Sequence, residues 1–420
     1  MYQPPASQTS MSENPAAPTT RATPSGGHSR SRRIFVELLE RLASGGLRVT
    51  FPEGVTRDLG SGTPLAHLRI LDESVFGHTL AYGDIGFAQG WMDGRWSVDD
   101  LAALLTLLAR DRDIIARGIH GHVVYLIGHR LWTLFRANTR RGARKNIEAH
   151  YDLGNEFYQL WLDPTMTYSS ALYSQPAEDA PGLDLEQAQR AKVRRMLERA
   201  GVQPGDRVLE IGCGWGGLAE IAATEFGAHV HGITLSPSQL AFAQARAQTG
   251  GWADRVHFEL RDYRDLNDTY DRVVSCEMFE AVGEAYWPSY FGQLARCLKP
   301  GARAVVQTIT IRDDLFPAYR KGTDFIQRYI FPGGKLPSPG VFTGLAGKAG
   351  LRVEGDLAFG LDYARTLAEW DRRFVAAQDR VRAMGYDERF CRMWRFYLAY
   401  CEAGFIAGSI DVHQFELVHA

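Results

Sequence analysis

The sequence lacks a long hydrophobic run, a cysteine framework and an excess of charge of one sign. No segment approaches the roughly 18 apolar residues of a membrane span, and the N-terminus has no apolar signal-peptide core, so we expect neither a membrane-spanning nor an exported protein. The five cysteines show no CxxC spacing, which favours a reducing cytoplasm and predicts neither a disulfide framework nor a metal site. A formal net charge of −2 gives no global basic field, so we expect no nucleic-acid partner.

Large aliphatic residues are scarce in residues 1–31, which are rich in Pro, Ser, Thr and Ala. Such a segment cannot bury enough apolar surface to offset the entropy of ordering, and we predict a disordered tail. From residue 34 the pattern IFVELLERLASGG is typical of an amphipathic helix ended by glycines, and strand-like and helical stretches follow. We therefore predict a small α+β domain over residues 34–130, interpreted as a docking or dimerisation module.

A basic linker is predicted over residues 131–149. Around it, aromatic and aliphatic side chains alternate with the cations Arg130, Arg136, Arg140, Arg141, Arg144 and Lys145. Such a segment can lie on an anionic bilayer, with its rings in the interface and its cations on phosphates. The alternative is an inter-domain helix followed by a solvated linker, and the sequence leaves both open.

The strongest chemical signal is RVLEIGCGWGGL at residues 207–218. An aliphatic run enters a glycine cluster and a helix-compatible segment follows, which is the order strand, tight turn, helix. Glycine permits the backbone angles of such a turn and a close approach of a ligand to the peptide plane. Glu210 lies two residues before Gly212, and this pattern resembles motif I of S-adenosylmethionine (AdoMet) methyltransferases more than a dinucleotide site.

Further strands are predicted over residues 229–235, 256–262, 271–278 and 303–310, with helical segments between them. This alternation is typical of a doubly wound, mainly parallel sheet that binds ligands at the carboxyl ends of its strands. The sequence thus predicts an α/β, Rossmann-like class I AdoMet methyltransferase domain over residues 150–420, preceded by the small α+β domain.

Residues 150–420 resemble the cyclopropane fatty acid synthase family, which includes the mycolic acid cyclopropane synthases. The matching segments are HYDLGNEFY, LDPTMTYSSALY, VLEIGCGWGG, GITLSPSQ, RDYRDL, MFEAVG, YIFPGGKLPS, DYARTLAEW and FCRMWRFYLAYCEAGF. The earlier stretch GDIGFAQGWMDGRW resembles the N-terminal module of the phospholipid-acting members. The resemblance implies AdoMet as the one-carbon donor and the cis double bond of a phospholipid acyl chain as the acceptor. We accordingly expect a cytoplasmic enzyme, peripheral on the inner face of a phospholipid bilayer and forming a homodimer.

Aromatic side chains suit this chemistry, because attack of an alkene on the sulfonium methyl leaves a carbocation. Tyr and Phe faces stabilise cations, and a dry site keeps water away from them. The C-terminal helical stretch with Trp394, Phe396, Tyr397 and Tyr400 is expected to line an acyl tunnel. A plain amphipathic core helix is the alternative.

The resemblance also implies the residues that bind AdoMet. They are Tyr168, Ser169, Glu210, Gly212, Gly214, Gly216, Thr234, Ser236, Gln239, Asp262 and Tyr263. Glu210 and the glycines would surround the amino-acid and ribose portions, Asp262 and Tyr263 would lie near the adenine, and Tyr168 with Ser169 would close the pocket. For any single residue, packing or capping is the alternative.

In the resembled family, a bound bicarbonate acts as base and is held by a Cys, a Glu, a His and a Tyr. The Glu matches Glu280 and the Tyr matches Tyr363, whereas the Cys position is Ser170 and the His position is Gln307. Ser170 and Gln307 can donate hydrogen bonds to an anion, but neither can be a cation. We predict these four residues as the catalytic site and expect the two exchanges to alter bicarbonate affinity and proton handling. Alternatively, Glu280 interacts with a helix dipole and Tyr363 is a core aromatic.

The product stays open at this point. Ring closure requires the transferred methyl group to lose a proton, whereas loss of a neighbouring chain hydrogen leaves a methyl-branched alkene. Two other classes of protein compete with a lipid-modifying enzyme. One is a small-molecule methyltransferase, and the other is an inactive lipid-binding protein, which the exchanges at Ser170 and Gln307 motivate.

Overall fold

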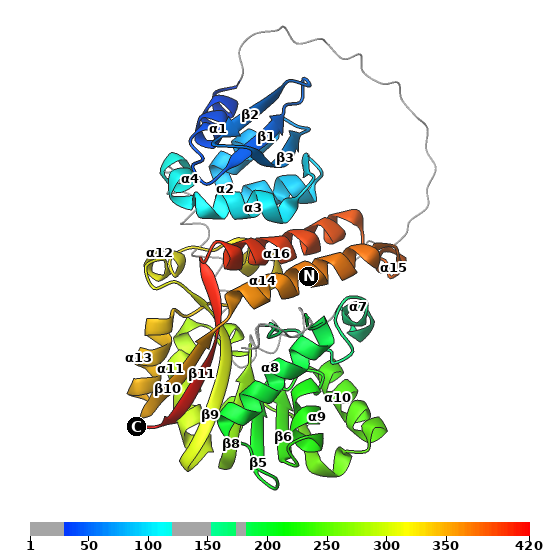
Figure 1. Cartoon of the computed structure of the whole chain (residues 1–420), viewed down its shortest axis with the longest axis vertical. Helices are drawn as coiled ribbons and strands as arrows, with labels where there is room; N and C mark the ends of the chain where they lie inside the picture. The colour runs from blue at the N-terminus through cyan, green and yellow to red at the C-terminus, as the bar shows by residue number, and fades with distance from the viewer. Residues whose placement is uncertain (1–28, 120–152, 174–181) are drawn as a thin grey trace, which may run out of the picture.

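The computed structural model describes residues 29–119, 153–173 and 182–420. The N-terminal domain lies above a layer formed by helices α14 (Gly360–Ala376) and α16 (Glu388–Ile406), and the large sheet lies below that layer (Figure 1). Most of the predicted tail and all of the predicted basic linker fall outside the described residues, so both stay predictions. None of the described helices is long and apolar enough to cross a bilayer.

The N-terminal domain is built on a four-stranded sheet in the order β2-β1-β3-β4, in which only β1 and β3 are parallel. Its elements are α1 (Arg30–Glu40), β1 (Gly46–Thr50), β2 (Thr56–Gly60), β3 (Pro64–Ile70), α2 (Ser74–Met92), β4 (Trp96–Val98), α3 (Leu101–Arg110) and α4 (Arg112–Ile119). Helix α1 begins inside the segment predicted to be a tail, because the Ser29 hydroxyl accepts a hydrogen bond from the Arg32 N–H at 3.2 Å and caps it.

The large domain contains a seven-stranded sheet in the order β10-β11-β9-β8-β5-β6-β7. Its strands are β5 (Arg207–Ile211), β6 (His229–Thr234), β7 (Val256–Leu260), β8 (Tyr270–Cys276), β9 (Leu298–Ile311), β10 (Leu351–Ala358) and β11 (Ile410–His419). Strands β5 to β9 run parallel, and β11 is antiparallel to both β9 and β10. The predicted doubly wound, mainly parallel sheet is confirmed.

Helices cover both faces of this sheet. The remaining helices are α7 (Asn155–Gln159), α8 (Leu185–Ala200), α9 (Gly217–Thr224), α10 (Pro237–Gly250), α11 (Trp287–Cys297), α12 (Phe316–Tyr319), α13 (Pro339–Lys348) and α15 (Gln378–Ala383). Helices α8, α9 and α10 share one hydrophobic cluster with the strands, and α11 and α13 share another. Apolar strand residues therefore pack on both sides, as expected for a parallel sheet.

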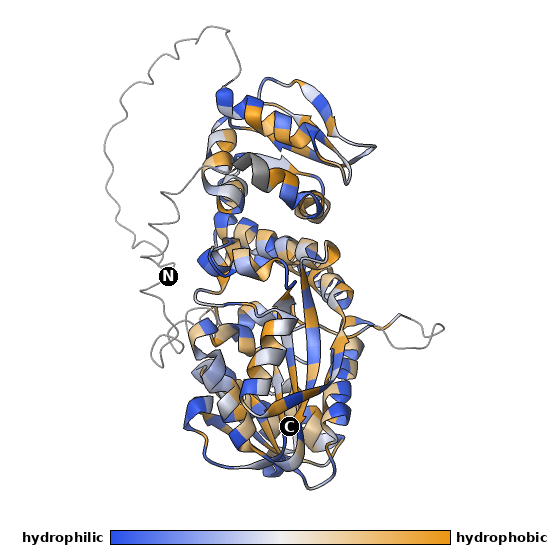
Figure 2. Cartoon of the chain, turned by 90° about the vertical axis from the view of Figure 1, so that its left-hand side faces the viewer, coloured by the Kyte–Doolittle hydropathy of each residue, from blue (hydrophilic) through white to orange (hydrophobic). Residues whose placement is uncertain are grey.

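The N-terminal domain packs on the large domain through α2 and α3, which lie against α16. The indole N–H of Trp91 donates to the carbonyl of Arg392 at 2.8 Å, and Asp93 pairs with Arg389 at 3.1 Å. One hydrophobic cluster continues from α1 and α3 through α14 and α16. In the side view, hydrophobic and hydrophilic residues alternate along the helices of the N-terminal domain and of the layer below it (Figure 2). The two domains thus share a core.

Candidate active site

A cavity lies at the carboxyl ends of β5, β6 and β8, where the fold predicts a ligand. Gly212 and Gly214, which follow β5, line it with positive φ angles of 87° and 51°. A Cβ atom at Gly212 would come within 2.9 Å of the Met278 side chain. Glycine is therefore needed both for the backbone angle and for the space at this turn.

The structure brings most of the predicted AdoMet residues together around this cavity. Those that line it are Tyr168, Ser169, Glu210, Gly212, Gly214, Thr234, Gln239, Asp262 and Tyr263. Two of the predicted residues lie elsewhere. Gly216 is the N-cap residue of α9, with a φ of 83°, and lies near Ala243. The Ser236 hydroxyl caps α10 by accepting from the Gln239 N–H. For these two, the capping alternative describes the observed contacts.

An unsatisfied carboxylate oxygen marks where a cationic group of a ligand fits. Glu210 is 3% exposed, and its Oε2 atom has no hydrogen-bond partner among the described residues. Burial raises the pKa of this carboxyl well above its ordinary value. Because AdoMet carries an ammonium group that can donate to this oxygen, the cavity suits that cofactor.

A second, larger cavity of about 680 Å³ lies between the two domains. Its wall is mostly apolar and includes Phe35 and Leu104 of the N-terminal domain and Phe396 and Tyr397 of α16. The two cavities share Tyr168, Glu277 and Ala281 as lining residues. An apolar chain in the large cavity would therefore meet a ligand of the small one at these residues.

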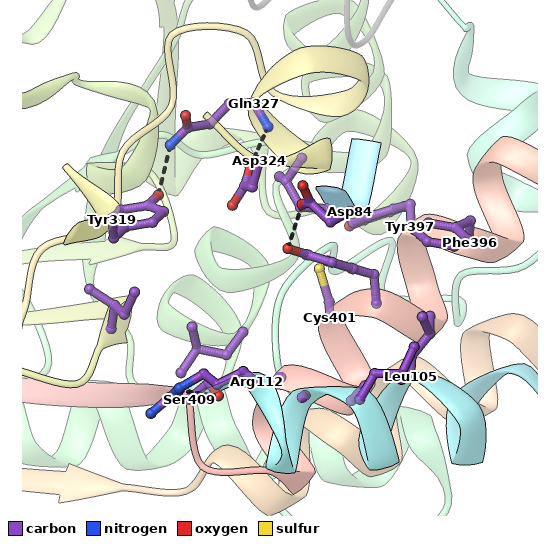
Figure 3. A pocket seen from close by; sticks show the side chains of 18 of the residues that line it. Asp84, Leu105, Arg112, Tyr319, Asp324, Gln327, Phe396, Tyr397, Cys401 and Ser409 are labelled. Atoms are coloured by element: carbon purple, nitrogen blue, oxygen red, sulfur yellow. Dashed lines mark hydrogen bonds between the residues drawn. The ribbon is translucent and has the colours of Figure 1, made fainter. Parts of the chain in front are cut away.

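Asp84, Asp324 and Gln327 gather in one part of the large cavity, with Arg112 and Ser409 in another (Figure 3). Asp84 accepts hydrogen bonds from the Tyr400 hydroxyl at 3.1 Å and the Phe325 N–H at 3.2 Å. Burial, with the charge of Asp324, raises the pKa of Asp84 to about 6. The N-terminal domain, interpreted from sequence as a docking or dimerisation module, thus contributes to the cavity wall.

The predicted catalytic residues surround a carboxylate that sequence reasoning missed. Glu277 Oε1 accepts from the Ser170 backbone N–H at 2.9 Å and from Gln307 Nε2 at 2.7 Å. Its Oε2 atom accepts from the Tyr363 hydroxyl at 2.6 Å. Three of the four residues predicted to hold an anion therefore bind this side chain. The Ser170 hydroxyl does not take part, because it donates to the Ala171 carbonyl at 2.9 Å.

Glu277 is held in a strained backbone conformation directly after β8. Its φ is 49°, which for a non-glycine residue costs on the order of 1–3 kcal/mol. The sequence signal that could have found Glu277 is its position directly after a strand, because polar residues at the carboxyl ends of parallel strands face the ligand site.

The orientation of Gln307 is set by a chain of hydrogen bonds that reaches helix α8. Gln414 on β11, opposite Gln307 in the ladder, donates from its Nε2 to Gln307 Oε1 at 2.9 Å. The Arg195 guanidinium of α8 in turn donates to Gln414 Oε1. Because Gln307 accepts from Gln414, its amino group faces Glu277.

Glu280, the predicted catalytic glutamate, lies close to Glu277 with different partners. Its Oε1 accepts from the Thr308 hydroxyl at 2.9 Å and from the Ile309 N–H, whereas its Oε2 is buried without a partner among the described residues. Burial and the charge of Glu277 raise the pKa of Glu280 to about 8. Burial also raises the pKa of Glu277, opposed by its donors and by Lys192. Two interacting carboxyls of this kind share a proton near neutral pH, and the donors favour the charge on Glu277.

The aromatic residues of α16 divide between wall and core. Phe396, Tyr397 and Tyr400 line the large cavity, and the Tyr397 hydroxyl lies 2.7 Å from that of Tyr168. Trp394 is 2% exposed and packs against Phe157 in the core. Three of the four residues therefore line a cavity and Trp394 belongs to the core, while the occupation of that cavity by an acyl chain stays a prediction.

One group of three metal-ligand types occurs in the described part of the chain, at β6 and β7. It consists of His231, His257 and Glu259 and lines neither cavity. His231 is bonded to Tyr270 at 2.6 Å and to Glu259 at 3.1 Å, and Glu259 also pairs with Arg261. These hydrogen bonds and the ion pair describe a polar network at the surface.

Comparison with known proteins decides the family. Residues 138–415 match the family described as mycolic acid cyclopropane synthetase. The chain belongs to this family. It is 42% identical over 341 residues to the tuberculostearic acid methyltransferase UfaA1 of Mycobacterium tuberculosis, covering 80% of this chain and 79% of the relative. It is 35% identical over 362 residues to the cyclopropane-fatty-acyl-phospholipid synthase of Escherichia coli, covering 84% and 88%.

Solved structures of the cyclopropane synthase family agree. The cyclopropane synthase MmaA2 of Mycobacterium tuberculosis is 31% identical and superposes with a TM-score of 0.60 over 65% of this chain and 97% of that chain. The same values hold for the mycolic acid cyclopropane synthase CmaA1 in complex with SAH and CTAB. The chain is therefore an AdoMet-dependent fatty acyl methyltransferase of the cyclopropane synthase type.

The raised pKa of Glu280 makes a prediction about stability. The unfolded chain loses this proton near pH 4.5, whereas the folded protein keeps it until about pH 8, so the wild-type free energy of unfolding falls between these values. Glu280→Gln does not titrate. We expect its free energy of unfolding, relative to wild type, to rise from pH 5 to pH 8 by roughly 2 kcal/mol or more.

Denaturant unfolding at several pH values would measure this difference. The exposed Glu156 on α7 supplies the matched control, Glu156→Gln. A Glu280→Gln effect that does not change with pH, like that of the control, would contradict the protonated state of Glu280.

Proposed function

We propose that this enzyme transfers a methyl group to the cis double bond of an unsaturated phospholipid acyl chain and yields a methyl-branched, unsaturated chain. Two observations support branching over ring closure. The 42% identical relative carries the name of a methyltransferase, for tuberculostearic acid. In addition, the Glu277 carboxylate accepts hydrogen bonds from three of the four residues predicted to hold bicarbonate.

In this proposal AdoMet, when bound, would supply an electrophilic methyl group. The electron pair of the alkene would form the new carbon–carbon bond, the sulfur–methyl bond would break with its electrons left on the thioether S-adenosylhomocysteine, and the acyl chain would carry a carbocation. Glu277 lines both cavities and so lies where the chain and the methyl donor meet. Its carboxylate stabilises the cation and accepts a proton from the neighbouring chain carbon. The electron pair of that C–H bond forms the new double bond, so the product gains one CH2 and keeps one unsaturation.

The surrounding residues keep Glu277 in its ionised form and the reaction dry. Tyr363, Gln307 and the Ser170 N–H donate to its two oxygens, which stabilises the anion. The proton on Glu280 removes a second negative charge from the site. The apolar wall of the large cavity excludes water that would quench the cation.

Methionine with a deuterated methyl group, supplied to a host expressing the protein, tests the product. We expect fatty acids that gain one carbon, retain three deuterium atoms and take up hydrogen on catalytic reduction, because the lost proton comes from the chain. Gas chromatography with mass spectrometry measures both quantities. Retention of two deuterium atoms without uptake of hydrogen would show ring closure instead, and an unmodified lipid pool would argue for a small-molecule substrate.

The role of Glu277 is tested by comparing two isosteric variants. Glu277→Gln removes the proposed base and is expected to lower turnover by at least ~100-fold. Glu280→Gln resembles the protonated state and is expected to retain turnover within about tenfold at pH 7. Calorimetry should find the same AdoMet affinity for both variants. If Glu280→Gln instead loses more turnover than Glu277→Gln, and turnover depends on added bicarbonate, the base is a bound anion held by Glu280.

We also propose that residues 131–149 bind the enzyme peripherally to an anionic phospholipid surface. The cations Arg140, Arg141 and Arg144 support this proposal, because polybasic segments are attracted to anionic lipids. Replacing these three residues with Ala should weaken binding to anionic vesicles at low salt and leave neutral vesicles unaffected. Sedimentation with both vesicle types measures this binding. Unchanged binding would show that the segment is a solvated linker.

A further inference from the structure

Lys192 on α8 is a buried ammonium group without a counter-ion in contact. The helix is fixed in place by the Asp184–Gln187 capping box at its start and by Gly201 at its end. Lys192 is 0% exposed, and among the described residues no carboxylate lies within 4.0 Å of it. Its Nζ atom donates to the Ser169 hydroxyl oxygen at 2.6 Å and to Cys276 Sγ at 3.4 Å. A buried charge with only neutral partners is costly, so an anion is expected to approach it.

The Ser169 hydroxyl lies beside Lys192. Its oxygen accepts from Lys192 and lies 3.3 Å from Cys276 Sγ. A serine hydroxyl has two acceptor positions and one donor hydrogen. Either the thiol or the hydroxyl can donate in the Ser169–Cys276 contact; when the thiol donates, the hydroxyl hydrogen is available to a ligand of the cavity. Ser169 and Lys192 both line the small cavity and together form a two-point site for an anion.

Glu210 supplies the complementary charge on the same cavity. Its buried Oε2 atom is without a partner in the described part of the chain. Burial raises the pKa of Glu210, and the charge of Lys192 partly opposes this rise although the two groups form no ion pair. An ammonium group placed at Glu210 and a carboxylate placed at Lys192 would satisfy both. An α-amino acid carries these two groups on one carbon atom.

We propose that Lys192, with the Ser169 hydroxyl, binds the α-carboxylate of the methionine part of AdoMet. The inference extends the cofactor site and does not depend on the proposed product. From the sequence, Ser169 was predicted to close the pocket, and no role was predicted for Lys192. The competing explanation is that Lys192 is a purely structural cation, balanced at longer range by Glu210 and Glu277.

The test compares two ligands that differ only in the carboxylate. They are S-adenosylhomocysteine and its decarboxylated analogue, the 3-aminopropyl thioether of adenosine. Calorimetry on the full chain is expected to show that the wild type binds the first about 10–100-fold more tightly, as for a charge-assisted contact. In Lys192→Met this preference should fall to within about threefold, because the carboxylate has lost its cation.

Two further variants complete the design. Arg190 lies on the same helix, pairs with Glu186 and lines neither cavity, so Arg190→Met should keep the wild-type preference. Ser169→Ala removes only the hydroxyl donor and should reduce the preference partially, which also tests the site if Lys192→Met fails to fold. The proposal is overturned if the wild type does not discriminate between the ligands, or if Lys192→Met and Ser169→Ala weaken both ligands equally. None of these measurements requires turnover.

Discussion

The active site depends on the burial of one carboxylate, that of Glu277, between two cavities. A charged carboxylate in a poorly hydrated interior is stable only when its oxygens receive hydrogen bonds. Here the donors come from three parts of the chain: the loop before α8, the strand β9 and the helix α14. The hydrogen bonds to the Glu277 carboxylate therefore join the sheet of the large domain to the helical layer that covers it. The same loop is fixed again at Ala171, whose N–H donates to Thr366 on α14 at 3.1 Å.

A second consequence concerns the proton on the neighbouring carboxyl. Glu277 and Glu280 are three residues apart in the sequence, and both side chains are partly buried. Two adjacent anions in such a site repel, so the group with fewer donors keeps its proton. Glu280 has one oxygen without a partner in the described structure, whereas both oxygens of Glu277 accept hydrogen bonds. The pair of Glu277 and Glu280 thus presents one negative charge, which suits the one developing positive charge of the proposed reaction.

Local patterns explain how much of this the sequence could predict. The strands, the glycine turn after β5 and the family motifs are short-range features, and the parallel sheet follows from them. Glu277 was missed because the motif MFEAVG draws attention to Glu280. Its importance comes from contacts with Tyr363 and Ser170, which are 86 and 107 residues away in sequence. The contribution of Ser170 was also mistaken in kind, because a backbone N–H, which no residue type reveals, makes the contact.

The N-terminal domain illustrates the same limit at a larger scale. Its sequence shows no acid-base pair, and a role apart from the chemistry follows naturally from that absence. The structure nevertheless places Phe35 and Leu104 of this domain in the wall of the large cavity, opposite Phe396 and Tyr397 of α16. Without that wall, the apolar face of α16 would lie open to water, at a cost proportional to the area exposed. A carbocation formed beside Tyr168 and Glu277 would then meet water before it could lose its proton. In the proposed reaction, a domain without catalytic groups would thereby take part in catalysis, because it would keep the reacting chain dry.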